Sequence, residues 1–417
     1  MNLSDFGVLR APRHVLFGAG QRAALAGHVS RLGRHALIVT DARMETTPHF
    51  AEMRRQLEEA GVRVTVFSEI EAELPLSCID AGCAVARDGD PQVDVVVGIG
   101  GGSCLDAAKS IAVLLTHGGS CADYYGEFKV PGPVLPIVSV PTTSGTGSEV
   151  TPVAVLADPE RALKIGIASP YIIPDVAICD PELTETCPPG LTAASGADAL
   201  THAIEALTTL RRPASGTMET DHVFVGKNAI SDVLALEAIR LIGASLVRAV
   251  ETGSDLGARS DMMRGALLAG LAFGSAGTAA AHAIQYPVGA KTHTAHGLGV
   301  ATLMPYVMAW NRSACTDDFE RIADALDAAE GEDAISAVAR LFERVGIPRT
   351  LRDLGVEEAD LDEIARLALA SERLIKNNPR PFAGDDMSRL VRAAFDGDRS
   401  DLGGAGSFRS SPETATT

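Results

Sequence analysis

The chain changes its sequence pattern between Cys187 and Gly190, and this change constrains the fold more than any other feature. Before it, short apolar runs alternate with segments of helical periodicity; after it, strand-like runs largely disappear and long Ala/Leu-rich segments follow. The first pattern predicts a parallel sheet with helices on both faces, and the second predicts an all-helical domain. A length of 417 residues also exceeds what one ordinary core contains. We therefore expect an α/β domain over residues 1–187, an all-helical domain over 188–398 and a disordered tail over 399–417.

Within the α/β domain, apolar runs bounded by turn residues define the expected strands. These strands are Val15–Phe17, Ala36–Thr40, Val62–Phe67, Val93–Ile99 and Val134–Val140. Helical periodicity between them predicts helices over Arg22–Leu32, Phe50–Ala60, Ile79–Arg87 and Cys104–Leu115. A hairpin of Val153–Ala157 with Lys164–Ala168 is expected beside the sheet. The main helices of the second domain are expected over Thr192–Leu210, Ser231–Val250 and Met262–Phe273.

The composition excludes several classes of function. The formal net charge is −18, so the chain lacks the basic surface that neutralises nucleic-acid phosphates or binds an anionic membrane. No apolar run of about 18 residues predicts a membrane span, and the N-terminus lacks the pattern of a secretory signal. The seven cysteines include no Cys-x-x-Cys pair and are expected to be reduced thiols. These features predict a cytoplasmic protein that binds small molecules.

Two loops that follow apolar strands carry groups able to bind an anion. Residues Gly98 to Ser103 read Gly-Ile-Gly-Gly-Gly-Ser and open an expected helix, whose first backbone amides can hold a pyrophosphate. Residues Pro141 to Glu149 read Pro-Thr-Thr-Ser-Gly-Thr-Gly-Ser-Glu and offer hydroxyls and free amides. Each loop alone is also explained as an ordinary tight turn. Two such loops at adjacent strand ends favour one shared nucleotide crevice.

Histidines in the second domain have a spacing that suits a metal. Asp198 and His202 are four residues apart on one face of an expected helix, and His282 and His296 are fourteen apart downstream. Each residue alone is more often structural, as a surface hydrogen bond, a core histidine or a helix cap. Together, one carboxylate and three imidazoles fit Fe(II), Zn(II) or Mn(II) and leave a position open for substrate. His293 is a further candidate for the same pocket.

With these residues laid out, the chain resembles the iron-containing (group III) alcohol dehydrogenase family over nearly its whole length. The resemblance rests on blocks that occur in order. They are Phe17-Gly18 with Gly20, Leu37 to Asp41, Gly100 to Lys109, Pro141 to Glu149, Gly196 to His202 and Asn378 to Pro381. The resemblance implies a dinucleotide-binding domain and a helical domain, an architecture shared with dehydroquinate synthase, with the active site in the cleft between them. A homodimer is the default expectation for the assembly.

The resemblance also implies roles for individual residues. Asp198, His202, His282 and His296 match the metal ligands, with Fe(II) as the expected metal. Residues Gly100, Gly101, Gly102 and Ser103 match the pyrophosphate loop; Asp106, Thr142, Thr143, Thr146, Ser148 and Lys164 match other cofactor-contacting positions. Asp41 matches the position that faces the adenosine ribose, where a carboxylate repels a 2′-phosphate, so NAD(H) is favoured over NADP(H). The implied reaction is hydride transfer between the nicotinamide and a small alcohol or aldehyde polarised by the metal.

The chain departs from the family at two places. Tyr286 stands four residues after His282, where a further histidine is usual, and its hydroxyl is a candidate for moving a proton, with His293 as a second candidate. The segment Arg211–Asn228 is longer than the usual connection, and its residues Lys227 and Asn228 are candidates for binding a substrate anion. This segment suggests a small aldehyde with a phosphonate or carboxylate group, such as phosphonoacetaldehyde. A solvated linker explains the same segment.

Other activities on a similar scaffold stay open at this point. A maleylacetate reductase has the same chemistry with another substrate, and a hydroxyacid-oxoacid transhydrogenase keeps its cofactor bound. A dehydroquinate synthase-like enzyme performs a non-redox cyclisation, with a metal set of one Glu and two His. A degenerate dehydrogenase that senses nucleotide is the non-catalytic alternative. Release of free NADH during oxidation of a simple alcohol would distinguish a dehydrogenase from a transhydrogenase, a cyclising enzyme or a nucleotide sensor.

Overall fold

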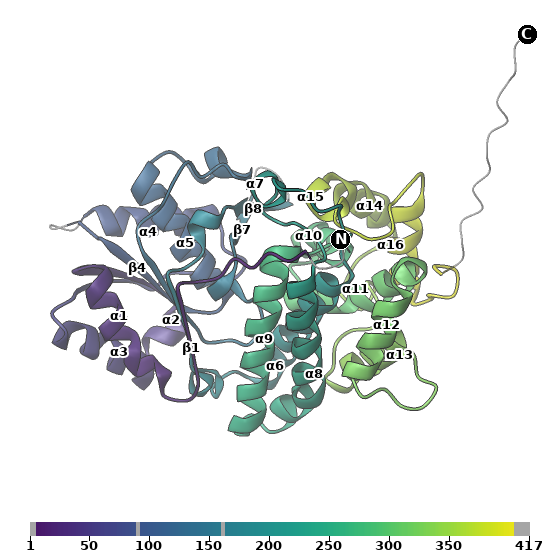
Figure 1. The fold of residues 1–417 in the computed structure, drawn as a ribbon, viewed down its shortest axis with the longest axis horizontal. Coiled ribbons are helices and arrows are strands. Elements are labelled where there is room, and N and C mark those ends of the chain that lie inside the picture. Colours follow the sequence, from purple (N-terminus) through teal and green to yellow (C-terminus); the bar gives the residue numbers. More distant parts are fainter. Residues whose placement is uncertain (1–5, 89–91, 160–162, 404–417) are drawn as a thin grey trace, which may run out of the picture.

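The computed structural model describes residues 6–88, 92–159 and 163–403. An α/β part and a helical part lie side by side, as the sequence pattern predicts (Figure 1). Most of the expected tail, residues 404–417, falls outside the described residues. Residues 399–403 do not belong to a free tail, because Leu402 is only 2% exposed and joins the core of the helical part.

The α/β part is built on a six-stranded parallel sheet with the order β1-β9-β6-β4-β2-β3. Its strands are β1 (His14–Phe17), β2 (His35–Val39), β3 (Arg63–Phe67), β4 (Val95–Gly100), β6 (Ile137–Pro141) and β9 (Val176–Cys179). All but β9 correspond to strands expected from the sequence. β9 was not expected, and it is placed in the sheet by pairing with β1 on one side and β6 on the other.

Helices cover both faces of this sheet because successive strand residues point to opposite sides. Short helix α1 (Leu25–Leu32) and α3 (Pro48–Glu59) pack on one face, whose residues include Ile38 of β2. Helices α4 (Leu76–Arg87) and α5 (Gly102–His117) pack on the other face, whose residues include Leu37 of β2. The single-turn helix α2 (Ala42–Glu45) follows β2 in the chain and packs against α3.

A second, three-stranded sheet lies beside the first. It contains β5 (Gly126–Glu127), β7 (Val153–Asp158) and β8 (Leu163–Ala168) in the order β5-β8-β7. The β7–β8 pair is antiparallel, so the expected hairpin is confirmed. Helix α5 packs against β7, and helix α10 of the helical part packs against β8. The hairpin therefore joins the two parts of the molecule.

The helical part begins with the helices expected from its Ala/Leu-rich segments. The helices are α6 (Pro189–Thr208), α7 (Met218–Asp221), α8 (Ala229–Glu251), α9 (Leu256–Ala276), α10 (Ala280–Thr292), α11 (His296–Asn311), α12 (Thr316–Ala325), α13 (Ala334–Arg344), α14 (Leu361–Ala370), α15 (Glu372–Ile375) and α16 (Asp386–Asp396). Helices α6, α8 and α9 run side by side and pack against one another (Figure 1). Among the described residues no single helix is long and apolar enough to cross a membrane; α9 and α10 pass that test only together, bent by 104°.

The N-terminal segment crosses from one part to the other. The amide of Ala229 donates to the carbonyl of Phe6, and the guanidinium of Arg10 donates to the carbonyls of Val223 and His222. Residues 6–10 therefore pack on the helical part before the chain enters β1 of the sheet. The boundaries 1–187 and 188–398 stay a prediction, and the contacts of residues 6–10 with the helical part run across the first of them.

Candidate functional site

The glycine loop lies where β4 meets α5. Helix α5 begins at Gly102 with no side chain capping it, so its first amides face outward without an intrahelical partner. Gly100 has a φ of +155°, and a Cβ there would meet Sγ of Cys104 at 2.5 Å. A Cβ on Gly102 would meet Cγ2 of Thr146 at 2.6 Å. These positions need glycine, and with Gly101 and Ser103 they leave the helix N-terminus open to an anion.

The second loop lies beside the first because β6 pairs directly with β4. Gly100 is in register with Pro141, and the amide of Thr142 donates to the carbonyl of Gly100 at 2.9 Å. Four hydroxyl-bearing residues of this loop line the same cavity as the glycine loop. They are Thr142, Thr143, Thr146 and Ser148. The structure thus brings the two predicted loops together in one crevice.

Three charged residues predicted to contact a cofactor line this crevice but also make internal contacts. Asp41 caps α2 by accepting from the amide of Met44 at 2.9 Å. Asp106 accepts from Oγ of Ser148 at 2.6 Å and from the amide of Val155 at 2.9 Å, so it fastens α5 to the second loop and to β7. Lys164 of β8 forms an ion pair with Glu73 at the cavity wall.

The four predicted metal ligands come from three helices of the helical part. Asp198 and His202 lie one turn apart in α6, His282 lies in the first turn of α10, and His296 is the first residue of α11. His296 comes close to α6 because Gly297 lies against the carbonyl of Ala194 with no room for a Cβ. All four side chains line the same cavity as the two loops.

The donor atoms of these residues converge on one point. Oδ1 of Asp198 is 3.8 Å from Nδ1 of His202, 3.9 Å from Nε2 of His282 and 4.0 Å from Nε2 of His296. Asp198, His282 and His296 form the compact set, with one ligand atom from each within 4.8 Å of the others. The ring of His202 lies alongside, stacked on Phe273 at 4.3 Å and on His282 at 4.7 Å between ring centroids.

The protonation states favour metal binding. Burial holds the pKa of His202 and of His296 well below the usual value, so both imidazoles are neutral and offer lone pairs. Burial raises the pKa of Asp198 to about 6, while the nearby His282 opposes that rise. At neutral pH the carboxylate of Asp198 is therefore largely ionised, and His202 and His296 offer neutral nitrogen donors.

Glu205 is a functional candidate that the sequence reading missed. Its carboxylate is 1% exposed, accepts from the amides of Ala279 and Ala281 at 2.8 Å each, and lies 2.7 Å from Nδ1 of His282. A carboxylate can only accept, so Nδ1 of His282 carries the hydrogen and Nε2 is left free to face Asp198. The available signal was a carboxylate three residues after His202 in an otherwise apolar helix, since buried carboxylates are rarely left unpaired.

The orphaned polar atoms indicate a cation at this point. Oδ1 of Asp198, Nδ1 of His202 and Nε2 of His282 are buried and have no hydrogen-bond partner among the described residues. Buried polar atoms without partners are costly, and a divalent transition metal with nitrogen and oxygen ligands would satisfy these three atoms together. Nε2 of His296 also faces this point, whereas its orphaned Nδ1 is the ring nitrogen that such an ion would not contact. The donor set therefore fits such a metal.

The cavity of about 490 Å³ connects the two groups of residues. One end is lined by the glycine loop, the Thr/Ser-rich loop and Asp41; the other is lined by the metal-ligand candidates and by side chains of the helical part. The latter include Phe224, Phe273, Tyr286 and Arg373. An anion-binding helix N-terminus and a metal-binding set thus open into one space.

The two candidates for proton movement differ in position. Tyr286 is 7% exposed, lines the cavity, and its ring centroid lies 6.3 Å from that of His296. Burial raises the pKa of its phenol, so the hydroxyl keeps its proton at neutral pH. His293 is exposed and does not line the cavity, because it ends α10 in a left-handed conformation with φ of 55°. The structure therefore does not support a catalytic position for His293.

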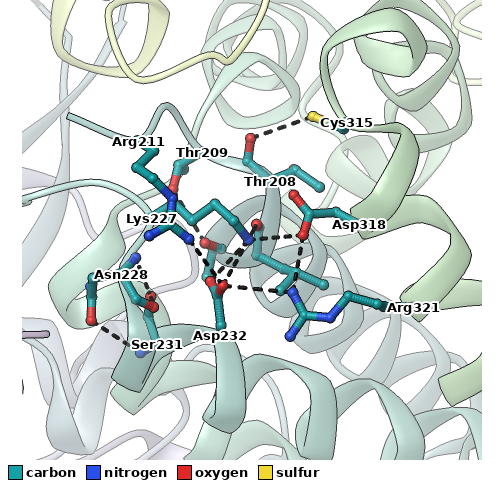
Figure 2. A network of polar contacts seen from close by, with 12 residues as sticks. Thr208, Thr209, Arg211, Lys227, Asn228, Ser231, Asp232, Cys315, Asp318 and Arg321 are labelled. Atoms are coloured by element: carbon teal, nitrogen blue, oxygen red, sulfur yellow. Dashed lines mark hydrogen bonds and ion pairs between the residues drawn. The ribbon is translucent and has the colours of Figure 1, made fainter. Parts of the chain in front are cut away.

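Lys227 and Asn228 also lie outside the cavity, contrary to the substrate-binding hypothesis. Figure 2 shows Nζ of Lys227 between Asp232 and Asp318, at 3.0 and 2.9 Å, and it also donates to the carbonyl of Leu207. Asn228 is fully buried and caps α8 by accepting from the amide of Ser231 at 3.2 Å. The ammonium is occupied by two carboxylates, so the segment does not offer it to a substrate anion. The residue of this segment that reaches the cavity is Phe224.

Comparison with known proteins adds an independent result. The family described as iron-containing alcohol dehydrogenase matches residues 12–181, and the C-terminal family of Fe-containing alcohol dehydrogenases matches residues 192–395. Long-chain-alcohol dehydrogenase 1 of Geobacillus thermodenitrificans is 40% identical over 399 residues, which cover 92% of this chain and 95% of that protein. A crystal structure of 1,3-propanediol oxidoreductase has a TM-score of 0.86 at 34% identity, covering 94% of this chain and 100% of its own. Sulfoacetaldehyde reductase from Bifidobacterium kashiwanohense, in complex with NAD+, has a TM-score of 0.78 at 28% identity, covering 94% and 100%.

Proposed function

The chain belongs to the iron-containing alcohol dehydrogenase family, and from this premise we propose that it transfers hydride between NAD(H) and a small alcohol or aldehyde at a divalent metal. The observation that carries the proposal is the shared cavity. Asp198, His202 and His282, whose facing atoms have no hydrogen-bond partner, and His296, whose Nε2 faces Asp198, line the same cavity as the uncapped N-terminus of α5. A metal site next to an anion site is the arrangement needed to place a nicotinamide beside a polarised oxygen.

The proposed ligands of the metal are Asp198, His202, His282 and His296, with Fe(II) as the expected ion and Zn(II) or Mn(II) as alternatives. When bound, such an ion acts as a Lewis acid on the oxygen of the alcohol or aldehyde. Glu205 holds His282 in the tautomer that leaves Nε2 free. The stacked ring of Phe273 fixes the plane of His202.

The proposed nucleotide site uses the first amides of α5 for the pyrophosphate, with the hydroxyls of the second loop beside them. We propose NAD(H) as the physiological cofactor because the carboxylate of Asp41, at the carboxyl end of β2, would repel a 2′-phosphate. The NAD+ complex of the sulfoacetaldehyde reductase supports this choice. The nicotinamide carries the hydride, so no protein nucleophile is required.

The helical side of the cavity would orient the substrate and exclude water from it. Phe224, Phe273 and Tyr286 supply apolar and aromatic surface next to the ligand candidates. The phenol of Tyr286 stays protonated at neutral pH, so its proposed part in proton movement is as a hydrogen-bonding relay and not as a base. The relatives are named for long-chain alcohols, 1,3-propanediol and sulfoacetaldehyde, so membership of the family does not by itself identify the substrate.

The test of this function is NADH and NADPH turnover by the whole protein. Protein stripped of metal and reloaded with Fe(II), Zn(II) or Mn(II) is assayed with a panel of neutral and anionic alcohols and aldehydes. We expect metal-dependent turnover, with NADH released to solution and preferred to NADPH. Tight nucleotide binding without turnover by any metal form would refute the proposal. A hydride that passes between two substrates without release of free NADH would indicate a transhydrogenase.

A further inference from the structure

Arg373 is a cation of the cavity wall on the side of the helical part. It lies in α15, is partly buried, and lines the cavity together with Phe224, Thr278 and Tyr286. Its guanidinium carbon stands 4.7 Å from the ring centroid of Phe224. Among the residues that the structure describes, no carboxylate forms an ion pair with this guanidinium. Its N–H groups are therefore not engaged by a described carboxylate.

Arg43 of α2 also lines the cavity, on the side of the α/β part, and donates to the carbonyl of Thr186 at 3.4 Å. The lysines near the site are engaged by carboxylates. Lys164 forms an ion pair with Glu73 at the cavity wall. Lys227, outside the cavity, is held by two carboxylates (Figure 2). A guanidinium left without a carboxylate in a cavity has five N–H donors in a planar fork that matches an oxyanion. Arg373 thus supplies, on the helical side of the cavity, a cation whose N–H donors can bind an oxyanion.

The aromatic ring beneath Arg373 is held in place by its surroundings. Phe224, beneath the guanidinium, is 5% exposed. The backbone amides of the two residues that flank it in the chain are hydrogen-bonded. The amide of Val223 donates to Glu127 at 2.9 Å, and the amide of Val225 donates to the carbonyl of Ser275 at 2.8 Å. The aromatic platform is therefore ordered before any ligand arrives, and a cation over it keeps its fork free for an anion.

Arg373 and the metal-ligand candidates line the same cavity. Helix α15, which carries Arg373, packs against α10, which carries Tyr286, and Leu374 beside Arg373 joins Tyr286 in one buried apolar cluster. Tyr286 in turn neighbours His296, with 6.3 Å between the ring centroids. Tyr286 therefore neighbours both the helix that carries Arg373 and the ligand set. A short substrate with an oxygen at the ligand set and an anionic group at its other end would meet both.

We propose that Arg373 binds the oxyanion group of a short substrate whose other end is the alcohol or aldehyde. The substrate class is a small hydroxy- or oxo-alkane carrying a carboxylate, sulfonate or phosphonate. The reaction balances as that of a simple alcohol: the alcohol carbon gives a hydride to NAD+, the hydroxyl gives a proton, and aldehyde and NADH result. This inference rests on the proposed dehydrogenase function and names its substrate class.

The experiment compares matched alcohols in the metal-loaded enzyme. 3-Hydroxypropionate, 2-hydroxyethanesulfonate and 2-hydroxyethylphosphonate are measured against neutral 1-propanol, in wild type, Arg373→Met and Arg373→Lys. The ratio of kcat/KM for an anionic alcohol to that for 1-propanol should fall roughly tenfold to a hundredfold in Arg373→Met. The loss should lie mainly in KM. Arg373→Lys should fall between, because it keeps the charge without the fork.

Two further measurements make the test decisive. Arg366→Met removes an arginine of α14 whose side chain is 69% exposed, and it should leave the ratio unchanged. Calorimetric binding of 3-hydroxypropionate, 2-hydroxyethanesulfonate and 2-hydroxyethylphosphonate to the enzyme with NAD+ reports on Arg373 even if turnover fails, and Arg373→Met should weaken it by the same factor. An unchanged ratio and unchanged anion binding in Arg373→Met, or a wild type that prefers 1-propanol, would overturn the inference. Failure of all alcohols to reduce NAD+, with anion binding still dependent on Arg373, would refute the dehydrogenase function instead.

Discussion

Substitution of Glu205 tests how the protein prepares its metal site. The carboxylate makes three contacts, with the amides of Ala279 and Ala281 at 2.8 Å and with Nδ1 of His282 at 2.7 Å. It therefore caps the N-terminus of α10 and fixes the tautomer of a proposed ligand with one group. Glu205→Gln nearly preserves the volume but places an NH2 group against one of these donors.

The expected losses of metal affinity and of stability follow from these two roles, tautomer control of His282 and capping of α10. Loss of the partner that orients a metal-binding histidine lowers metal affinity roughly tenfold to a hundredfold, which is about 1.4–2.7 kcal/mol. Loss of the acceptor for two buried amides costs about 1–3 kcal/mol each, so Glu205→Ala should also destabilise the metal-free protein by about 2–6 kcal/mol. Glu205→Gln retains one acceptor oxygen and should lie below that range.

The assay separates affinity from stability. Metal affinity is measured by competition with a chelator of known strength, and the stability of metal-free protein by urea unfolding. Asp255→Ala is the control, because it removes a helix cap from α9, where Asp255 accepts from the amide of Ala258 at 2.9 Å. This control should lose about 0.5–2 kcal/mol of stability and keep its metal affinity. If Glu205→Gln loses stability but binds metal as tightly as the wild type, Glu205 is only a helix cap and the reasoning fails.

Three further predictions concern the cofactor, the ion-pair cluster and a buried acid. Asp41→Asn keeps an oxygen to cap α2 but removes the charge, so kcat/KM for NADPH relative to NADH should rise roughly tenfold or more; an unchanged ratio would exclude Asp41 as the selector. Lys227→Met removes one cation from Asp232 and Asp318, which keep their ion pairs with Arg321, so urea unfolding should show a loss of about 1–3 kcal/mol with no change in substrate KM; the reverse result would return Lys227 to the substrate site. Burial raises the pKa of Glu149 from its ordinary value of 4.5 to about 7. Between these two pH values the native state therefore holds a proton that the unfolded chain has released. The stability that this group contributes falls as pH rises from 4.5 to 7. Glu149→Gln should remove about 3 kcal/mol of that pH dependence in unfolding measurements on metal-free protein, and an unaltered slope would show that another group causes it.

The sequence predicted the elements whose pattern is local. β2 and β4 are buried on both faces and read as continuous apolar runs, and the long helices α6, α8 and α9 read as Ala/Leu-rich segments. β9 was not predicted although it is fully buried, and its pairing with two neighbouring strands is what places it in the sheet. Local pattern thus predicts the long helices and the longer buried strands, whereas the four-residue β9 depends on tertiary pairing.

The site was predictable to the extent that its residues have distinctive chemistry. The structure brings Asp198, His282 and His296 together as their residue types suggest. Arg373 gave no signal, because its segment reads as a polar surface helix and only the fold places it in the cavity. Lys227 was predicted to bind a substrate anion because a lysine in a polar segment is expected to be exposed. Tertiary packing instead gives it two carboxylate partners.

The central claim is direct hydride transfer that depends on a metal at the Asp198 site. A single-turnover experiment with a 1,1-dideuterated alcohol and NAD+ tests it most directly, in metal-loaded wild type, in metal-stripped wild type and in Asp198→Asn. The account predicts one deuterium at C4 of the reduced nicotinamide in the loaded wild type, with the rate lowered by roughly a thousandfold or more in the other two. Deuterium transfer at the same rate without metal, or no deuterium in the nicotinamide despite oxidation of the alcohol, would contradict it.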